Sequence, residues 1–527
     1  MIAMLGAALV VALAVKASAT SLTSQPVMWE DLADLDVFRI GGDFYYSASS
    51  MHYSPGAPLL HSTDLVNWEY IGHSVPTLDW GSKYSLQGGN AYVKGVFASS
   101  IRQRPSDGTW FWVGCVEYSH SYIYTAPSAT GPWTKWAEYP NQCFYDCGLL
   151  FDDNESPYIA YGSKTIQVAQ LSSDLKTIVS TRAVYTYDGN AEGSRMYKIK
   201  GTYYILNIDP AKMVQYVVKS TSVFGPYRSF KLLDGPSCPI PGAGNPHQGG
   251  IVDDPQGNWY YMAFCDAFPG GRVPVLAPIS FNDQGFPQLL DPSEWPSNVT
   301  TPMPPSSPRQ ASFQETFQNT SLGPQWEWNH NPLTSAFSVG GNDRLTLRTA
   351  SVTHDIYKAR NTLTHRIPGP KSSATIKLSY SNMHYGDRAG LVLLRDLSSW
   401  IGIVNHNGTS AIAVWANCTL TMDNNSIWST GSLGSLQASV DIPPPQNDAA
   451  NPGSVWLRAT ADIAPSGPHT VNFAYSFDGI AFEDIGDPFV MVKSWEFFLG
   501  YRYGIFNFAT RALGGSVRVE SFAINGA

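Results

Sequence analysis

The sequence predicts an all-β protein with two domains, a five-bladed β-propeller followed by a jelly-roll-like β-sandwich. A phrase made of a short apolar run, a Gly/Asp/Asn turn and an aromatic-rich run recurs along the first half, in segments that begin at Asp36, Ser99, Gly148, Ser194 and Gly249. Residues 296–310 are then rich in proline and serine. Beyond them, short runs alternate apolar and polar residues without a helical period, which is typical of strands.

Each copy of the phrase has the pattern of a β-hairpin, as in DVFRIGGDFYYS from Asp36 and GGIVDDPQGNWYYMAF from Gly249. Hairpins that recur roughly every 45 to 65 residues are typical of propeller blades. A twisted stack of sheets is the alternative, but it gives no reason for the turn and the aromatic run to recur at equivalent places. We therefore expect five blades around one axis within residues 20–295.

The segment PSNVTTPMPPSSPRQ at 296–310 changes the composition abruptly. Proline-rich chain is extended and semi-rigid, so this segment is predicted to be the interdomain linker. Residues 311–527 contain runs such as RLTLRTA, SATIKLSY and SVRVESFAI, separated by turns. This pattern favours a β-sandwich.

The N-terminus, residues 1–19, reads MIAMLGAALVVALAVKASA. An apolar stretch followed by Ala17-Ser18-Ala19 is typical of a secretory signal peptide with its cleavage site. A transmembrane anchor needs about 20 apolar residues, and Lys16 interrupts the run too early. We therefore expect a secreted, extracellular protein. No later segment is long and apolar enough to span a bilayer.

The sequons and the cysteines fit the same compartment. N-glycans are predicted at some of six N-x-S/T sequons, which begin at Asn154, Asn298, Asn319, Asn407, Asn417 and Asn424. The chain has six cysteines, and no further Cys or His stands at the spacing of a zinc site. Disulfides are therefore the expected use of the cysteines, and the sequence leaves their pairing open.

The composition excludes several classes of function. The formal net charge is −9, and no cluster of Lys and Arg offers a surface for nucleic acid. The G-x-S-x-G elbow, the phosphate-binding loop and the H-E-x-x-H motif do not occur. Few charges and many aromatic residues suit a rigid, turn-rich protein that contacts sugars, and we expect it to be monomeric.

One position of the repeated phrase holds chemically active residues. Three or four residues before the first apolar residue of each copy stand Asp34, Phe97, Asp146, Glu192 and His247. Equivalent blades would bring these positions together near the axis. Glycoside hydrolysis needs one carboxylic acid to protonate the leaving oxygen and one carboxylate to activate water or to attack. A third carboxylate can raise the pKa of the proton donor by like-charge repulsion.

Several segments of the first domain resemble glycoside hydrolase family 43. They are LADLDVFRIGGDFYYSASSMHYSPGAPLLHSTDLVNWEYIG from Leu32, YDCGLLFDD from Tyr145, NAEGSRMYKIKGTYYIL from Asn190 and HQGGIVDDPQGNWYYMAF from His247. The resemblance implies a five-bladed propeller that acts on arabinose and xylose linkages of plant cell walls. It implies that Asp34 is the general base, Asp146 the pKa modulator and Glu192 the general acid of an inverting mechanism without a cofactor. We accordingly expect a bell-shaped pH profile on the acid side of neutrality.

Two positions depart from the family pattern. Leu35 follows Asp34 where the family commonly has proline, and GVFASS replaces a GIWAPS-like stretch, so that Phe97 stands where a tryptophan often borders the sugar. The resemblance also implies that Arg272 binds substrate and that His247 lies beneath the sugar, where the axial channel can hold a calcium ion or waters. Calcium prefers oxygen ligands, so His247 alone does not make a metal site.

Within the family, the chain is most similar to fungal secreted arabinofuranosidases that remove arabinose from arabinoxylan, some of them from doubly substituted xylose. Tyr145 beside Asp146 and the run YRYGIFNFAT carry this resemblance, which implies that Tyr145 binds substrate. It implies that the sandwich closes one side of the substrate groove with Tyr503 or Phe506, whose rings can stack on a sugar. A β-xylosidase is the alternative enzyme, and a non-catalytic carbohydrate-binding protein is the alternative from another class.

Overall fold

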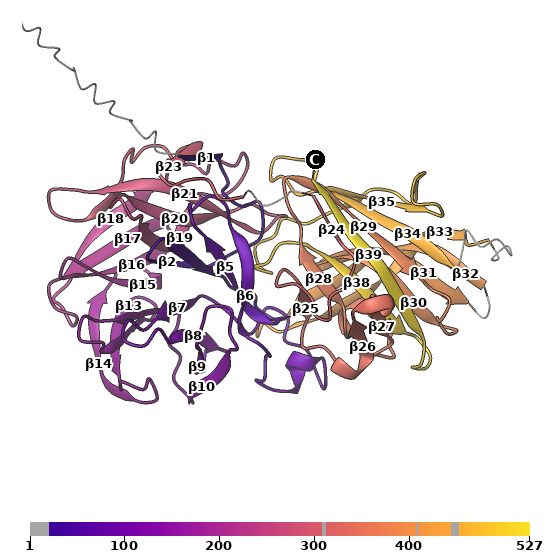
Figure 1. Ribbon diagram of the computed structural model, residues 1–527, viewed down its shortest axis with the longest axis horizontal. Helices are drawn as coiled ribbons and strands as arrows, with labels where there is room; N and C mark the ends of the chain where they lie inside the picture. The colour runs from indigo at the N-terminus through magenta and orange to yellow at the C-terminus, as the bar shows by residue number, and fades with distance from the viewer. Residues whose placement is uncertain (1–19, 308–311, 407–408, 444–452, 527) are drawn as a thin grey trace, which may run out of the picture.

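The computed structural model of this chain describes residues 20–307, 312–406, 409–443 and 453–526. The predicted signal peptide, part of the predicted linker and the sequon at Asn407 lie outside the described residues. The prediction of an all-β protein with a propeller and a sandwich is confirmed, and Figure 1 shows the two domains side by side. No helix in the described part of the chain is long and apolar enough to cross a membrane.

Within residues 20–307, the propeller consists of five four-stranded antiparallel sheets. The inner strands are β2 (Asp36–Ile40), β7 (Ser99–Gln103), β11 (Gly148–Phe151), β15 (Glu192–Ile199) and β19 (His247–Asp253). Blade one continues with β3 (Asp43–Ser47), β5 (Gly56–Ser62) and β6 (Glu69–Val75), and blade two with β8 (Trp110–Val116), β9 (His120–Ala126) and β10 (Thr134–Tyr139). Blade three continues with β12 (Pro157–Tyr161), β13 (Thr165–Leu171) and β14 (Ile178–Thr186), and blade four with β16 (Thr202–Asp209), β17 (Val214–Ser220) and β18 (Arg228–Asp234). Blade five is completed by β20 (Trp259–Asp266), β21 (Arg272–Phe281) and β22 (Pro287–Leu289).

The blades pack against one another through apolar clusters that each join two neighbouring blades. Successive side chains of a strand point to opposite faces of its sheet, and here both faces are buried. Leu149 therefore packs with blade two, whereas Leu150 packs with blade four. In the same way, Tyr203 contacts blade three and Tyr204 contacts blade five. This double burial explains the aromatic-rich second half of each repeated phrase.

Arg195 lies at the centre of the ring of blades. Its side chain is fully buried. The guanidinium donates to the backbone carbonyls of Asp34 at 2.8 Å, Leu35 at 2.9 Å and Cys147 at 2.6 Å. It thereby ties blades one, three and four together immediately beneath two of the predicted catalytic positions. The hydrogen bonds to these carbonyl oxygens satisfy the buried donors of the guanidinium and offset the free-energy cost of its desolvation.

The chain after blade five packs on blade one. Strand β23 (Asn298–Thr301) pairs with β1 (Ser21–Ser24), and the backbone N–H of Ser306 donates to Asp64 at 2.8 Å. The described part of the predicted linker is therefore attached to the propeller instead of running free between the domains. Because Asp64 belongs to blade one, this contact closes the ring at its two ends.

The second domain consists of two sheets packed face to face, counted over the described residues from 312 onward. One sheet contains β26 (Phe337–Val339), β27 (Leu345–Arg348), β39 (Ser516–Gly526), β29 (Lys371–Ser379), β34 (Ser454–Asp462), β35 (Thr470–Ser476) and β36 (Glu483–Asp484), with β24 (Phe313–Glu315) on β39 and β37 (Phe489–Val490) on β35. The other contains β33 (Trp428–Asp441), β32 (Thr409–Met422), β31 (Leu397–His406), β30 (Asp387–Leu394), β38 (Arg502–Ala509), β28 (Leu363–Arg366) and β25 (Glu327–Asn329). Short 3-10 turns are η1 (Ser82–Ser85), η2 (Thr334–Ala336), η3 (Gly341–Asp343) and η4 (Ile356–Lys358).

The two domains share one sheet and one buried ionic cluster. Strand β4 (Tyr53–Ser54) of the propeller pairs with β25 of the sandwich. Next to this pairing, the fully buried carboxylate of Glu327 contacts Arg366 at 3.1 Å and His73 at 3.2 Å, and it also accepts from Arg502. The two arginines hold the carboxyl pKa of Glu327 well below its usual range, against the opposing effect of burial. The sandwich is therefore fixed rigidly to the propeller.

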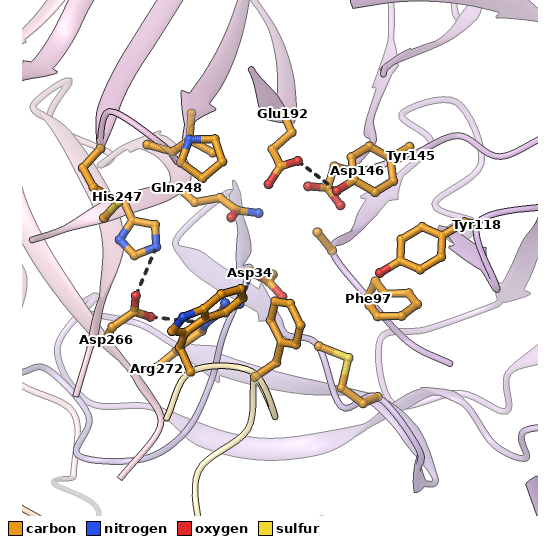
Figure 2. Close-up of a pocket in the computed structure, with 17 residues that line it drawn as sticks. Asp34, Phe97, Tyr118, Tyr145, Asp146, Glu192, His247, Gln248, Asp266 and Arg272 are labelled. Carbon is orange, nitrogen blue, oxygen red and sulfur yellow. Dashed lines mark hydrogen bonds and ion pairs between the residues drawn. The ribbon is translucent and has the colours of Figure 1, made fainter. Parts of the chain in front are cut away.

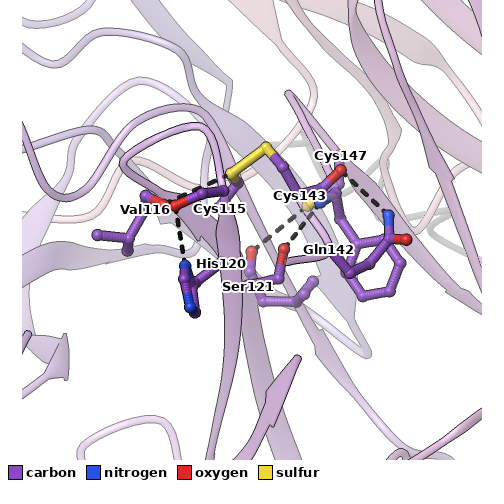
Figure 3. The surroundings of a disulfide bond; sticks show 10 residues. Cys115, Val116, His120, Ser121, Gln142, Cys143 and Cys147 are labelled. Carbon is purple, nitrogen blue, oxygen red and sulfur yellow. Dashed lines mark hydrogen bonds between the residues drawn. A yellow bond between two sulfur atoms is a disulfide. The ribbon is translucent and has the colours of Figure 1, made fainter. Parts of the chain in front are cut away.

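Two disulfides occur among the described residues. Cys115 at the end of β8 is bonded to Cys143, and Cys238 is bonded to Cys265. Figure 3 shows the first of these beside Cys147, a buried free thiol. The expectation that cysteines form disulfides is confirmed for two pairs. Asn154, Asn298, Asn319, Asn417 and Asn424 of the predicted sequons are all exposed.

Candidate active site

A pocket of about 440 Å³ opens at the axis of the propeller, on the side that faces the sandwich loop 493–500. Asp34, Phe97, Asp146, Glu192 and His247 all line it, so the five equivalent positions converge as the repeat predicts. Figure 2 shows the three carboxylates around one central space, with the aromatic residues on one side and His247 with Arg272 on the other.

The backbone just before each inner strand aims these side chains into the pocket. Asp34 and Asp146 have φ of 55° and 49°, in the left-handed region that non-glycine residues visit rarely. In blade four, the pairing of β15 shifts register after Glu192, and Gly193 there has φ of 70°. Strained residues of this kind persist where the surrounding fold enforces them, which is characteristic of functional sites.

Both carboxylate oxygens of Asp34 are held by donors. Arg272 donates from Nη1 to Oδ1 at 3.1 Å, and Ser49 donates from Oγ to Oδ2 at 2.6 Å. The guanidinium of Arg272 also lies 3.3 Å from Asp266 and is nearly buried. A carboxylate that accepts hydrogen bonds at both oxygens is held in one orientation. The surroundings of Asp34 therefore suit a base.

Glu192 and Asp146 form a pair of acids with raised pKa values. Burial raises the pKa of Glu192, and the nearby charge of Asp34 adds to the increase. The pKa of Asp146 lies well above its usual range because Asp146 is buried and because Glu192 and Asp34 stand close to it. Tyr145 donates to Oε2 of Glu192 at 2.9 Å, which lowers the pKa of that carboxyl in part. Two neighbouring acids of this kind retain a proton at a pH where ordinary carboxyls are ionised.

Aromatic rings form one wall of the pocket. Phe97 stacks on Tyr118 with ring centroids 5.1 Å apart, and Tyr118 lies 6.0 Å from Tyr145. Tyr118 is 55% exposed, so one face of its ring borders the pocket mouth. Sugars present apolar C–H faces that pack well against such rings. Phe97 and Tyr145 thus lie where the resemblance places substrate-binding residues.

The surroundings of His247 do not fit a calcium ion. Its Nδ1 lies 2.8 Å from the carbonyl of Asn245, and its Nε2 lies 3.9 Å from Asp266. Calcium takes six to eight oxygen ligands. Asp266, the nearest carboxylate to His247, already forms an ion pair with Arg272. The described residues hold no group of three or more His, Cys, Asp or Glu side chains arranged for a metal. Burial lowers the pKa of His247, which favours a neutral ring.

The sandwich contributes to the pocket, but through other residues than expected. Tyr503 and Phe506 are fully buried and do not line the pocket, so their predicted place in the substrate groove is wrong. Tyr503 lies in the sandwich core and donates to the carbonyl of Ser372. Phe506 packs in the apolar cluster between the domains, against Trp400.

The residues that reach the pocket from the sandwich are Trp495 and Phe498. Sequence analysis missed both of them, together with Tyr118, Gln248 and Asp266. Trp495 and Phe498 lie outside any strand, in a segment without a repeat to mark it. Gln248 stands directly beside His247. The glycine that follows it, Gly249, was the signal available in the sequence, because in the structure this residue adopts φ of 111° at the bulge of β19.

The arrangement can carry out acid–base hydrolysis of a glycosidic bond. A protonated Glu192 can deliver its proton to a leaving oxygen, and an ionised Asp34 can take a proton from water. Tyr145 and Asp34 influence the pKa of this acid in opposite directions, and the rings of the pocket wall can hold the sugar. Fold and site together define a glycoside hydrolase with a rigid, preorganised set of carboxyl groups.

Comparison with known protein families identifies the family of this chain. Residues 23–287 match Glycosyl hydrolases family 43, and residues 314–525 match the Beta xylosidase C-terminal Concanavalin A-like domain. The chain belongs to glycoside hydrolase family 43, a family of inverting glycosidases that need no cofactor for catalysis.

Individual relatives bear different activity names. A solved structure of a family 43 hydrolase, engineered in its active site to display both endo-xylanase and exo-arabinofuranosidase activity, is 42% identical, with a TM-score of 0.90 over 96% of this chain and 100% of that one. A β-xylosidase of Formosa agariphila is 25% identical over 94% of this chain and 89% of its own length. A non-reducing end α-L-arabinofuranosidase of Bacteroides ovatus is 25% identical over 69% of this chain and 72% of its own.

Proposed function

We propose that this protein is a secreted hydrolase that removes terminal α-L-arabinofuranosyl side chains from arabinoxylan with inversion of configuration. The observation that supports this choice most strongly is the 42% identity, over almost the whole of both chains, to the engineered enzyme that displays exo-arabinofuranosidase activity together with endo-xylanase activity. The relatives named β-xylosidase are considerably more distant, at 25% and 29% identity.

The form of the pocket also favours a hydrolase of chain ends or side chains. It lies at the propeller axis, is walled by Tyr118, Tyr145 and Phe97, and is bordered by Trp495 of the sandwich. A pocket of this form admits a terminal sugar unit, whereas cleavage within a chain needs an open cleft. The β-strands and the domain interface hold the walls in place before substrate arrives.

In the proposed reaction, Glu192 protonates the glycosidic oxygen while Asp34 removes a proton from a water molecule on the opposite face of the sugar. The water oxygen bonds to the anomeric carbon as the bond to the leaving oxygen breaks. Burial and the charge of Asp34 favour the protonated form of Glu192. Arg272 and Ser49 keep Asp34 in a fixed orientation for the water.

The second candidate is a β-xylosidase. The names of several curated relatives favour it, and the same three carboxyl groups could act on either pentose. A non-catalytic carbohydrate-binding role is the third alternative. Retention of all three acids in one pocket argues against it.

The test is product analysis on arabinoxylan and on oligosaccharides with singly and doubly substituted xylose, comparing wild type with Glu192→Gln. Release of L-arabinose by the wild type alone, first as the inverted anomer in a time-resolved NMR measurement, is the expected result. Release of D-xylose instead would establish the second candidate. Equal release by wild type and variant would refute the catalytic assignment, and the retained anomer would refute inversion.

Secretion and N-glycosylation belong to the same proposal. Two disulfides support an oxidising compartment, and the exposure of Asn154, Asn298, Asn319, Asn417 and Asn424 leaves them open to an oligosaccharyltransferase. Mass analysis of the protein from the culture medium of its producer, before and after deglycosylation, tests both. An N-terminus still beginning at Met1 would contradict the signal peptide.

A further inference from the structure

Gln248 is held in an unusual backbone conformation at the floor of the pocket. It lies in the bulge at the start of β19, with φ of 50°. Its backbone N–H donates to the side chain of Gln215 at 3.0 Å, and its carbonyl accepts from the hydroxyl of Tyr261 at 2.9 Å. Because both backbone groups are fixed by buried side chains, the direction of the Gln248 side chain is fixed as well.

The side-chain amide of Gln248 is buried but not satisfied. The residue is 6% exposed, and its Nε2 has no hydrogen-bond partner among the described residues. The side chain packs over Gly193, where a Cβ atom would come within 3.1 Å of its Cγ. Figure 2 shows the amide between His247 and Glu192, pointing toward the centre of the pocket. A buried donor without a partner is costly, so a group from outside the chain is expected to accept from it.

The other polar groups around the pocket floor have different chemistry. Asp34 already accepts from Arg272 and Ser49, and Glu192 accepts from Tyr145. Carboxylates supply acceptors, whereas the amide nitrogen of Gln248 supplies two neutral donors. A sugar hydroxyl accepts one hydrogen bond and donates another. An amide donor beside carboxylate acceptors therefore matches a hydroxyl that is bound from both sides.

We propose that Nε2 of Gln248 donates a hydrogen bond to one hydroxyl of the terminal pentose of the substrate, whose own proton is accepted by a neighbouring carboxylate. Gln248 is thereby a specificity-determining residue, which selects a sugar with a hydroxyl at that ring position and orients its anomeric carbon toward Glu192 and Asp34. This inference rests on the proposed pentosidase function. It holds for either pentose, because it concerns the hydroxyl and not the identity of the ring.

The experiment combines a size-matched variant with altered substrates. Gln248→Met removes the donor and keeps the length of the side chain, and Gln170→Met, on β13 outside this pocket, is the matched control. Values of kcat/KM are measured with the aryl α-L-arabinofuranoside, the aryl β-D-xyloside and the monodeoxy analogues of the better substrate. Binding of free L-arabinose and D-xylose is measured by calorimetry.

We expect Gln248→Met to lower kcat/KM on the parent substrate about 10- to 100-fold, with Gln170→Met within about twofold of wild type. On one monodeoxy analogue, wild type and Gln248→Met should differ by less than about threefold, because the hydroxyl that Gln248 contacts is already missing. If Gln248→Met fails to fold by thermal unfolding, Gln248→Asn, which retracts the amide by one methylene, replaces it in the same comparison.

Two results would overturn the inference. One is an unchanged kcat/KM in the folded variant; the other is a loss of the same size on every deoxy analogue, which would indicate a structural role without a particular hydroxyl. Hydrolysis of the xyloside alone would refute the arabinosidase proposal and leave the comparison valid on the xyloside series. Absence of binding and hydrolysis for both pentoses would refute both proposals.

Discussion

Phe498 of the sandwich lies against Arg272 of the propeller, with the guanidinium carbon 5.0 Å from the ring centroid. A second ring, that of Phe264, lies 5.3 Å from the same guanidinium carbon, so the arginine that holds Asp34 contacts rings from both domains. Cation–π contacts of this kind restrain a long side chain. The sandwich is therefore part of the active site, because it helps to fix the proposed base.

Substitution of Glu192 by Gln should reduce hydrolysis according to the leaving group. Loss of the proton donor lowers kcat on arabinoxylan by about 10²- to 10⁴-fold. A dinitrophenyl arabinofuranoside needs little protonation of its leaving oxygen, so its rate should fall much less. Steady-state kinetics on both substrates measure the difference. Equal losses on both would argue that Glu192 acts in another way.

The pH profile should extend to higher pH than an ordinary glutamate would allow. Burial and Asp34 raise the pKa of Glu192, so this residue stays protonated, and active as the acid, above the pKa of a free glutamate. The hydrogen bond from Tyr145 lowers that pKa in part. Tyr145→Phe should therefore move the alkaline limb of the kcat/KM profile to higher pH, with about a 2- to 10-fold lower maximum. An alkaline limb that moves to lower pH in Tyr145→Phe would contradict the conclusion that the Tyr145 hydrogen bond lowers the pKa of Glu192.

Substitution of Trp495 by Ala should weaken the binding of polymer selectively. The ring is 59% exposed at the rim of the pocket, where it can contact sugars beyond the terminal unit. We expect KM on arabinoxylan to rise about 3- to 10-fold, while kcat/KM on an aryl arabinofuranoside stays within about twofold. Phe498→Ala is the contrasting variant and should lower kcat on both substrates, because Phe498 packs on Arg272. Identical effects of the two variants would be evidence against separate roles for Trp495 in polymer binding and Phe498 in positioning Arg272.

Substitution of Glu327 by Gln should destabilise the whole protein. The change leaves two buried arginines without their anion and should cost about 3–5 kcal/mol of unfolding free energy. Glu327 has a lowered pKa in the folded state, so its contribution is complete above the pKa of an unfolded glutamate and disappears as the pH falls through the folded value. The difference between wild type and variant should thus be constant from about pH 5 to 7 and shrink in stronger acid. Urea unfolding at several pH values checks both statements.

Removal of the Cys115–Cys143 disulfide by a double Ser substitution should cost about 3–4 kcal/mol, as expected for a cross-link with a sequence separation of 28. The bond joins the strand end before Tyr118 to the loop before Tyr145. We therefore expect a higher KM as well as a lower Tm. Cys147→Ser is the control for a nearby buried thiol, and an equal loss in that variant would argue against the cross-link as the cause.

The repeated phrase located the three acids because equivalent residues of equivalent blades must meet at the axis. The same reasoning could not reach Asp266, which ends β20 outside the repeated position, or Phe498, whose position depends on a loop of the second domain and on its docking. It was wrong for Tyr503 and Phe506 for a physical reason. All eight residues of β38 are buried, since one face of the strand meets the sandwich core and the other meets the propeller. The alternation of side chains between the two faces of such a strand therefore does not identify residues that reach a pocket.

Arg195 connects the backbone of two blades that carry acids of the pocket. Its guanidinium donates to the carbonyls of Asp34 and Leu35 in blade one and to that of Cys147, which follows Asp146, at the start of blade three. Any displacement of blade one against blade three would therefore have to strain this single side chain before it could change the spacing of Asp34 and Asp146.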